Sequence, residues 1–385
     1  MNQLDAILAV LQEHPEASRD AVLTTVVHVK GSAYRRPGAR MVILQDGRRF
    51  GSISGGCLEG DVCRKAWWFT EDRKPAVRVY DTSADDEVVW EFGLGCKGQV
   101  HLLFERVNDA GTAEMLRFLT SAGAARRPVV VATIIASGVA ARVGDRLLFD
   151  ADGVRGGSLA GSALESDVLA QVRECYLQQR SHLARLPGME VFVESIAPAL
   201  SLIVFGAGHD AQPLVRFAGE LGWKVTVADG RANYATRERF PEASRVVVLD
   251  PKEPLRGIEV TRETAMVFLT HNYNQDLALL RHVLPLKPRY LGLLGPKSRA
   301  EELLAEVALP VTGIDVHAPI GLDLGSDAPV SIALAVVAEI QAVVCGRDGG
   351  KLRERQAPIH DPAIESGIAD EQLAVSQESA ICELS

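Results

Sequence analysis

Short β-branched runs alternate with amphipathic segments through the second half of the chain. The amphipathic segments have the spacing of helices, and the runs between them have the length of strands. The predicted strands are Ser201 to Phe205, Lys224 to Ala228, Arg245 to Leu249, Ala265 to Thr270 and Tyr290 to Leu294, and the clearest helices are Ala211 to Leu221 and Gln275 to Leu284. This alternation predicts a doubly wound parallel sheet of the Rossmann type, with ligands beyond the carboxyl ends of its strands.

The first half contains an internal repeat. Residues 41–62 align without a gap with residues 147–168, which lie 106 positions later, and the strands predicted at 22–29 and 128–135 fall at the same spacing. Glu105 aligns with Glu194 at a shorter spacing of 89. The duplication predicts two related α+β units. Gly56-Cys57 of the first copy is replaced by Ser162-Ala163 in the second, which indicates a structural partner that has lost the chemistry.

We therefore expect an α/β chain in which a C-terminal Rossmann-type sheet follows an α+β region with an internal duplication. The predicted boundaries are 1–109 for the first copy, 110–198 for the second, 199–346 for the nucleotide-binding domain and 347–385 for a polar tail that is partly disordered or laid on the surface. The apolar run 332–344 contains Glu339 and Gln341 and is shorter than the roughly 20 residues of a membrane span, so it predicts a core helix.

Charge and cysteine usage narrow the possible functions. The 385 residues include 41 Lys and Arg against 50 Asp and Glu, a formal net charge of -9, which gives no reason to expect binding to nucleic acid or to a membrane. The N-terminus lacks the features of a secretory signal, so we expect a cytoplasmic protein. Six cysteines without a CxxC pair or a zinc-ligand spacing predict neither a disulfide framework nor a structural zinc.

The first motif with chemistry is Gly206-Ala-Gly208-His209, between a predicted strand and a predicted helix. Gly206 suits a tight turn, Gly208 lets the backbone approach a phosphate, and the helix start favours an anion. Asp229 ends the next strand about 20 residues on, where an acid that binds ribose belongs. Arg231 suits a 2′-phosphate or an adenine ring, although a solvated loop arginine is an equal alternative. Asp210 would repel a bound anion.

Two further motifs follow strands at the same sheet edge. Thr270-His271 begins a loop that reaches Asp276, and a histidine with an acid there suits acid-base chemistry or metal binding. Because the loop has no second histidine, hydrogen bonding within the loop is the favoured role for His271. Gly295 follows the fifth strand and precedes Lys297 and Arg299, two cations that favour an anionic ligand or simply an exposed helix start.

Two glycine-rich bends in the first copy carry cysteines. Ser54-Gly55-Gly56-Cys57 leads into a predicted helix, and a helix start favours the thiolate form of Cys57. Cys96 stands in a second such bend beside Lys97, which favours thiolate in the same way. The duplicated unit lacks both thiols, and the adjacent glycines admit a bulky ligand. We therefore predict that Cys57 and Cys96 act on a ligand, as metal ligands or in sulfur chemistry, whereas Cys63 and Cys175 do not.

The segment 30–40 holds four cations, Lys30, Arg35, Arg36 and Arg40, in a predicted turn region. Such a cluster suits an anionic head group, although a solvated loop would have much the same composition.

Together these segments resemble the XdhC/CoxI family of accessory proteins for molybdenum hydroxylases such as xanthine dehydrogenase. The motifs that carry the resemblance are Gly31-Ser32 with Arg35, Gly38-Ala39-Arg40-Met41, Ser54 to Cys57, the bend at Cys96, Gly206 to His209, Asp229-Gly230-Arg231, Thr270-His271, Tyr290 to Gly295 and Gly321 to Gly325. The sequence departs from the family pattern at Tyr34, Asp210, Tyr273 and Ala328 to Ser331.

The resemblance implies a protein that binds molybdenum cofactor (molybdopterin) and shields it. It further implies support for the exchange of an oxo for a sulfido ligand by a cysteine desulfurase, and delivery of the cofactor to an apo molybdenum hydroxylase. We accordingly expect an accessory protein rather than a turnover enzyme, and a homodimer. The alternatives from the Rossmann half are an NAD(P)-dependent oxidoreductase and a regulatory protein that senses an adenine nucleotide.

Overall fold

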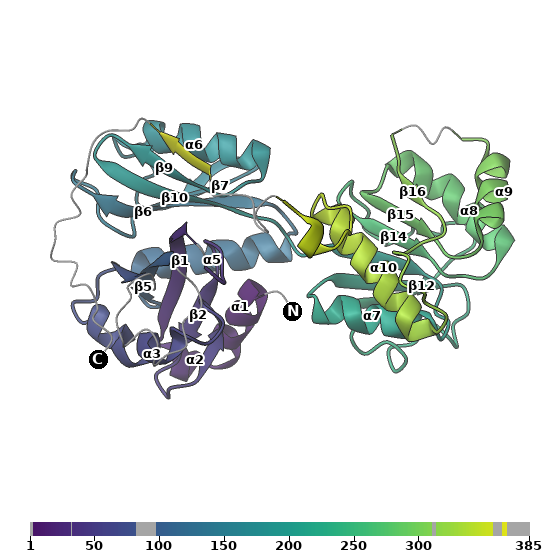
Figure 1. The fold of residues 1–385 in the computed structure, drawn as a ribbon, viewed down its shortest axis with the longest axis horizontal. Helices are drawn as coiled ribbons and strands as arrows, with labels where there is room; N and C mark the ends of the chain where they lie inside the picture. The colour runs from purple at the N-terminus through teal and green to yellow at the C-terminus, as the bar shows by residue number, and fades with distance from the viewer. Residues whose placement is uncertain (1–2, 32, 82–97, 310–312, 357–363, 368–385) are drawn as a thin grey trace. The chain divides into compact units, whose positions relative to one another are not determined.

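The computed structural model describes residues 3–31, 33–81, 98–309, 313–356 and 364–367 (Figure 1). These residues fall into two compact units. One unit comprises Gln3–Pro198 together with residues 364–367, and the other runs from Ala199 to residue 356. The first unit contains two largely antiparallel sheets, and the second contains one parallel sheet (Figure 1).

The first copy of the repeat forms an antiparallel sheet in the order β3-β2-β1-β5-β4. Its strands are β1 (Val22–Gly31), β2 (Arg40–Ile43), β3 (Arg49–Gly51), β4 (Ala76–Asp81) and β5 (Gly98–Arg106). Helix α3 (Glu59–Phe69) packs on one face of this sheet through Val62, Ala66 and Phe69. Helices α1 (Gln3–Glu13) and α2 (Pro15–Ser18) precede the first strand.

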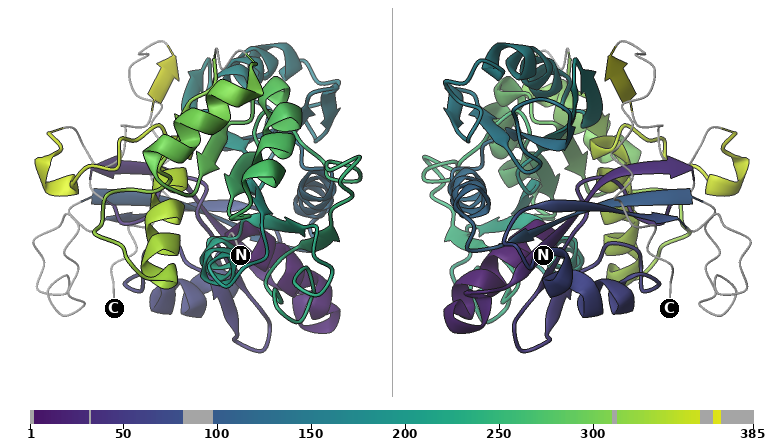
Figure 2. Two further views of the ribbon diagram at one scale, coloured as in Figure 1. Left: turned by 90° about the vertical axis from the view of Figure 1, so that its right-hand side faces the viewer. Right: turned by 90° about the vertical axis from the view of Figure 1, so that its left-hand side faces the viewer.

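The second copy repeats this architecture strand for strand. Its strands are β6 (Val129–Ser137), β7 (Arg146–Asp150), β8 (Gly153–Gly156), β9 (His182–Leu186) and β10 (Met189–Ile196), and its helix is α6 (Glu165–Gln178). The order β8-β7-β6-β10-β9 corresponds to that of the first copy, which confirms the predicted duplication. Helix α5 (Ala110–Ala124) joins the copies and is viewed end-on in Figure 2. Part of the predicted polar tail is ordered, because β17 (Ile364–Gly367) pairs in parallel with β9.

The register corrects one detail of the predicted alignment. Thr25 pairs with Arg40, and Thr133 pairs with Arg146. The two arginines are 106 positions apart, as predicted, but the two threonines are 108 positions apart. The first strands of the two copies therefore do not share the spacing of 106, because the connection that follows is two residues longer in the first copy.

The two sheets pack on each other through equivalent positions. Their shared core includes Val27 and Leu103 of the first copy with Ile135 and Phe192 of the second. Val27 and Ile135 stand at the irregular points of the β1–β5 and β6–β10 ladders, so the same bulge recurs in both copies. The two copies thus form a pseudo-symmetric pair within one chain.

The second unit is a six-stranded parallel sheet in the order β13-β12-β11-β14-β15-β16. Its elements are β11 (Ser201–Phe205), α7 (Ala211–Glu220), β12 (Lys224–Asp229), β13 (Arg245–Val248), β14 (Ala265–Phe268), α8 (Tyr273–Val283), β15 (Tyr290–Leu293), α9 (Lys297–Val307), β16 (Val316–His317) and α10 (Pro329–Val344). Helices α7 and α10 cover one face and α8 and α9 the other. The Rossmann-type prediction is confirmed, and all five predicted strands are present.

Helix α10 begins three residues before the predicted apolar run and has both a buried and an exposed side. Val336 and Ile340 lie in the core, whereas Val330 and Leu334 are about half exposed. Among the described residues, no helix is both long enough and apolar enough to span a membrane.

Candidate functional site

The turn after β11 requires a glycine at its first position. Gly206 has a φ of +113°, and a Cβ atom there would stand 2.3 Å from the carbonyl oxygen of Leu269. The end of β14 therefore approaches the turn so closely that a side chain is excluded. This place, where β11 has β12 on one side and β14 on the other, is the switch point at which α/β sheets bind ligands.

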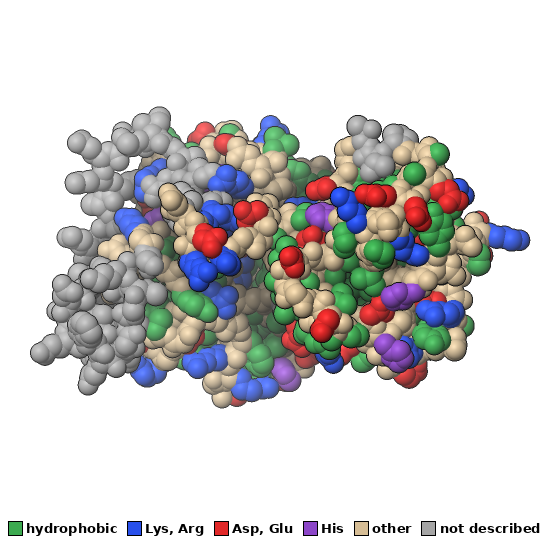
Figure 3. All heavy atoms as spheres, turned by 45° about the vertical axis from the view of Figure 1, so that its right-hand side comes forward, with side chains coloured by type: hydrophobic (Ala, Val, Ile, Leu, Met, Phe, Trp, Pro, Cys, Tyr) green, Lys and Arg blue, Asp and Glu red, His purple; other side chains and the backbone are tan. Residues whose placement is uncertain are grey.

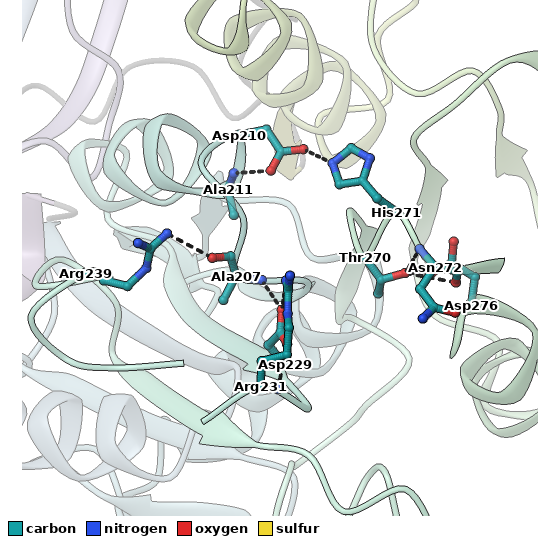
Figure 4. Close-up of polar contacts among 10 residues, drawn as sticks. All are labelled: Ala207, Asp210, Ala211, Asp229, Arg231, Arg239, Thr270, His271, Asn272 and Asp276. Atoms are coloured by element: carbon teal, nitrogen blue, oxygen red, sulfur yellow. Dashed lines mark hydrogen bonds and ion pairs between the residues drawn. The ribbon is translucent and has the colours of Figure 1, made fainter. Parts of the chain in front are cut away.

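Asp229, the predicted ribose-binding acid, is bonded within the protein. Its carboxylate accepts hydrogen bonds from the backbone N–H of Ala207 at 2.7 Å and from the backbone and guanidinium of Arg231. Burial opposes ionisation, but these hydrogen bonds outweigh it and lower the pKa of Asp229. The Arg231 guanidinium lies 4.1 Å from the centroid of the Tyr234 ring. Both carboxylate oxygens of Asp229 therefore already accept hydrogen bonds from the protein, and the Arg231 guanidinium already pairs with Asp229 (Figure 4).

Asp210 links two turns at the mouth of the site (Figure 4). One carboxylate oxygen accepts from the backbone N–H of Ala211 at the start of α7, and the other lies 2.6 Å from Nε2 of His271. His271 adopts a φ of +55°, which is uncommon for a residue with a side chain. The prediction that His271 bonds within its own loop is wrong, because its partner comes from the turn after β11.

Thr270 begins a second polar chain at the same edge. Its hydroxyl donates to Asp276, which in turn accepts a hydrogen bond of 2.8 Å from Arg299. Gly295 lies beside the Arg299 side chain, since a Cβ on Gly295 would come within 3.0 Å of Cδ of that arginine. Arg299 therefore pairs with a buried carboxylate rather than standing free for an anion, whereas Lys297 is exposed.

A pocket of about 380 Å³ opens beside these turns. Most of its lining is aliphatic, and its polar groups are two histidines and two aspartates. The lining residues are Gly208, His209, Asp210, Leu214, Leu269, His271, Leu294, Asp327, Pro329, Ile332, Ala333 and Val336. It thus joins the predicted site residues Gly208, His209 and His271 to the first half of α10.

The glycine-rich loop of the first copy is organised by Glu59, a residue to which the sequence assigned no role. Its carboxylate accepts six hydrogen bonds, from the hydroxyls of Ser52 and Ser54 and from the backbone N–H groups of residues 53–56. Burial alone would raise the pKa of Glu59, but the hydrogen bonds from Ser54 and Ser52 outweigh it and lower the pKa to about 2. The backbone donors of Ser54, Gly55 and Gly56 are therefore already occupied.

Cys57 lies just beyond this occupied loop. It is exposed, and it precedes Leu58, the residue that caps α3. Gly55 and Gly56 both have positive φ, and a Cβ on Gly56 would meet nothing within 4 Å. A Cβ on Gly55 would instead meet the ring of Tyr34 at 2.7 Å. The loop thus presents the Cys57 thiol beside open space at Gly56, with Tyr34 covering Gly55.

The remaining cysteines for which the sequence made a prediction are Cys63, Cys96 and Cys175. Cys175 is fully buried, and burial together with Glu194 and Glu174 raises the pKa of its thiol to about 12. Cys63 is half-buried on α3, with Arg49 4.0 Å from its sulfur. Cys96 lies outside the described residues. No group of three or more His, Cys, Asp or Glu side chains suited to a metal ion occurs in the described part of the chain.

Arg40, which was predicted with the other cations of segment 30–40 to suit an anionic head group, is instead paired within the protein. It is buried and pairs with Glu194 of the second copy, with Nη1 2.8 Å from Oε1. The equivalent arginine of the second copy, Arg146, pairs with Glu105 of the first. Both arginines therefore hold the two copies together.

Two family descriptions match this chain. The description "XdhC Rossmann domain" covers residues 202–340, and "XdhC and CoxI family" covers residues 15–81 and 122–187. The chain belongs to the XdhC and CoxI family. The resemblance inferred from the motifs is thereby confirmed, and the two separate matches of the second description fall on the two copies of the repeat.

Relatives support this membership over most of the chain. The chain is 32% identical over 339 residues to a Bacillus subtilis protein named as a probable xanthine dehydrogenase subunit, covering 88% of this chain and 95% of that protein. It is 25% identical over 344 residues to the molybdenum cofactor insertion chaperone PaoD of Escherichia coli, covering 88% and 87%. A crystal structure described as a xanthine dehydrogenase of Bacillus halodurans superposes with a TM-score of 0.74 at 29% identity, covering 89% and 97%.

The segments shared with the XdhC and CoxI family include both candidate regions. Cys57 and Glu59 lie in the first matched segment, and Gly206, Asp210 and His271 lie in the Rossmann match. Cys96 lies between the matched segments. The family match thus covers the organised loop of the first copy and the pocket of the second unit.

Proposed function

We propose that this protein is a molybdenum cofactor chaperone, which holds the cofactor and inserts it into a molybdenum hydroxylase of the xanthine dehydrogenase type. The observation that carries the proposal is the exposed thiol of Cys57 at the end of a loop fixed by Glu59. Thiolate is a ligand that suits a soft metal centre. The similarity to PaoD, a molybdenum cofactor insertion chaperone, supports the same cargo.

In this proposal Cys57 and Cys96 contact the metal end of the cargo or relay sulfur to it, and Ser54, Gly55 and Gly56 shape the approach to Cys57. A cysteine desulfurase supplies the sulfur, an apo-hydroxylase receives the cofactor in the cytoplasm, and the chaperone acts as a homodimer. Because Glu59 already uses the backbone donors of the loop, the loop contributes shape and an exposed thiol rather than N–H groups for a phosphate.

The test is purification of wild type and cysteine variants from a host that makes the cofactor. We expect Cys57→Ala and Cys96→Ala to lose bound molybdenum and activation of the apo-hydroxylase, with Cys63→Ala as the matched control that keeps both. Light scattering on the same samples tests the homodimer. Wild-type delivery by the Cys57→Ala/Cys96→Ala double variant would refute the thiol mechanism.

A nucleotide function of the second unit is the alternative candidate. The observation that favours it is the pocket beside Gly206 and Gly208 at the switch point of the sheet. In this alternative, NAD(P) or another adenine nucleotide binds near Gly206, Gly208, His209, Asp229, Arg231, Thr270, His271 and Gly295, as a redox cofactor or a regulatory signal. Titration of the protein with NAD, NADP and AMP tests this alternative. If none of the three nucleotides binds, the alternative is refuted.

A further inference from the structure

The charged side chains that line the pocket of the Rossmann unit are mainly acidic. Among the residues that the structure describes, no lysine or arginine lines the pocket, whereas the carboxylates of Asp210 and Asp327 do. Figure 3 shows hydrophobic side chains bordered by acidic ones on the face of this unit turned to the viewer. A pyrophosphate here would meet like charges at short range, in surroundings that screen them less than bulk water does.

Two backbone donors of the turn are also engaged within the protein. The N–H of Ala207 donates to Asp229 at 2.7 Å, and the N–H of Ala211 donates to Asp210 at 3.0 Å. Asp210 therefore stands at the helix start in the position of the anion that the helix dipole attracts. His271 holds its second oxygen at 2.6 Å. With these two donors occupied and the Asp210 carboxylate in place, an uncharged group suits this part of the pocket better than a phosphate does.

Asp327 is the carboxylate that remains available in the pocket. It is exposed, it lies two residues before the start of α10, and it has no hydrogen-bonding or ion-pair partner among the described residues. Two adjacent oxygens on one carboxylate match two adjacent N–H donors on one ring edge. A 2-amino-4-oxopyrimidine presents such a pair, from its ring nitrogen and its amino group. Guanine and pterins share this edge, and adenine lacks it.

The walls of the pocket suit a flat bicyclic ring. Leu214, Leu269, Leu294 and Ile332 provide aliphatic surface, and Ala333 leaves room between them. A volume of about 380 Å³ lies within the range of small-molecule sites. Apolar walls with one hydrogen-bonding carboxylate are the arrangement by which proteins fix the orientation of a heterocycle.

We propose that this pocket binds an uncharged bicyclic heterocycle with a 2-amino-4-oxopyrimidine edge, and that Asp327 receives the two N–H donors of that edge. The proposal rests on the proposed function in one respect, since the cargo supplies such a ring as its pterin. The second unit then recognises the pterin of the cargo. In this proposal NAD(P) is not the ligand of the pocket.

The experiment is calorimetric titration of the full-length protein with neopterin, guanosine, adenosine and NAD. We expect neopterin and guanosine to bind and adenosine and NAD not to bind, and the stronger of the first two identifies the source of the ring. Asp327→Asn replaces one acceptor oxygen by a donor, so we expect it to weaken neopterin at least about 10-fold. Asp323→Asn, an exposed carboxylate that does not line the pocket, is the matched control.

Two further variants keep the outcome decisive. Ala333→Leu should abolish neopterin binding by filling the pocket, with a melting curve to show that the unit folds. Cys57→Ala should bind neopterin as the wild type does, so its loss of molybdenum would concern the thiol proposal alone. Binding of NAD at least as tight as that of neopterin, no binding of either ring, or an unchanged affinity in Asp327→Asn would overturn the pterin pocket and leave the Cys57 proposal standing.

Discussion

Arg40 of the first copy donates two hydrogen bonds to the carboxylate of Glu194 in the second, and both side chains are buried. Burial would lower the pKa of Arg40, but the negative charge of Glu194 and its hydrogen bond raise it. Arg146 and Glu105 make the reciprocal pair. Two buried ion pairs thus connect equivalent positions in opposite directions.

We predict that the Arg40–Glu194 pair is costly to break on one side only. Arg40→Met leaves a buried carboxylate without its partner, which should destabilise the N-terminal unit by about 3 to 5 kcal/mol. Arg40→Met with Glu194→Leu should recover most of this loss, because neither charge then remains buried alone. Urea unfolding of the single and double variants measures the difference. Equal stability of both would show that the pair is not coupled.

Glu59 gives the second prediction, which concerns pH. Because its folded pKa is lowered from 4.5 to about 2, its contribution is present at neutral pH and is lost as pH falls from about 4.5 toward 2. The shift corresponds to about 3 kcal/mol at neutral pH and about 1 kcal/mol near pH 3. The stability gap between wild type and Glu59→Gln should therefore narrow on acidification. Glu165→Gln is the matched control, and a gap that stays constant with pH would contradict this role of Glu59.

The cysteines should differ in accessibility to alkylation. Cys57 is exposed, whereas Cys175 is fully buried with its pKa raised to about 12 by burial and nearby carboxylates, so its thiol stays protonated and shielded. Iodoacetamide should modify Cys57 in the folded protein and Cys175 only after unfolding in urea. Peptide mass spectrometry reads both sites in one sample. Modification of Cys175 at the rate of Cys57 in the native state would contradict the burial argument.

Two glycines of the Rossmann unit should differ in how well they tolerate an added methyl group. Gly206→Ala places a Cβ 2.3 Å from the Leu269 carbonyl at a positive φ, so we expect a loss of about 3 kcal/mol or more in unfolding free energy. Gly230→Ala is the control, because a Cβ there would meet only Gln275, at 3.9 Å. Thermal unfolding compares them. A tolerated Gly206→Ala would show that β14 can move away from the turn.

The sequence predicted the Rossmann sheet well because strand length, helical spacing and turn glycines are local signals. It predicted the duplication for a similar reason, since aligned residues need no knowledge of contacts. The side-chain partners were harder to predict. Asp210 and His271 lie 61 positions apart, and only the arrangement of parallel strands brings their turns together.

The roles of Glu59 and Arg40 could have been predicted from the internal repeat. Glu59 recurs as Glu165 in the repeat, and an acid beside a glycine-rich turn can accept several backbone N–H groups. Arg40 aligns with Arg146, and Glu105 with Glu194, so the repeat places two arginines and two acids at equivalent positions of the two copies. The cationic cluster at 30–40 was predicted from neighbours along the chain, whereas the partner of Arg40 is Glu194 of the other copy.

Joining the two copies in one polypeptide has a consequence that a pair of separate chains could not have. In a homodimer every substitution appears twice, so a loop with chemistry and a loop without it cannot coexist. Here Glu59 collects six donors around one loop, while the equivalent Glu165 accepts from the Gly161 N–H. Because the two repeats lie in one polypeptide, one loop can specialise while both copies keep the shared interface.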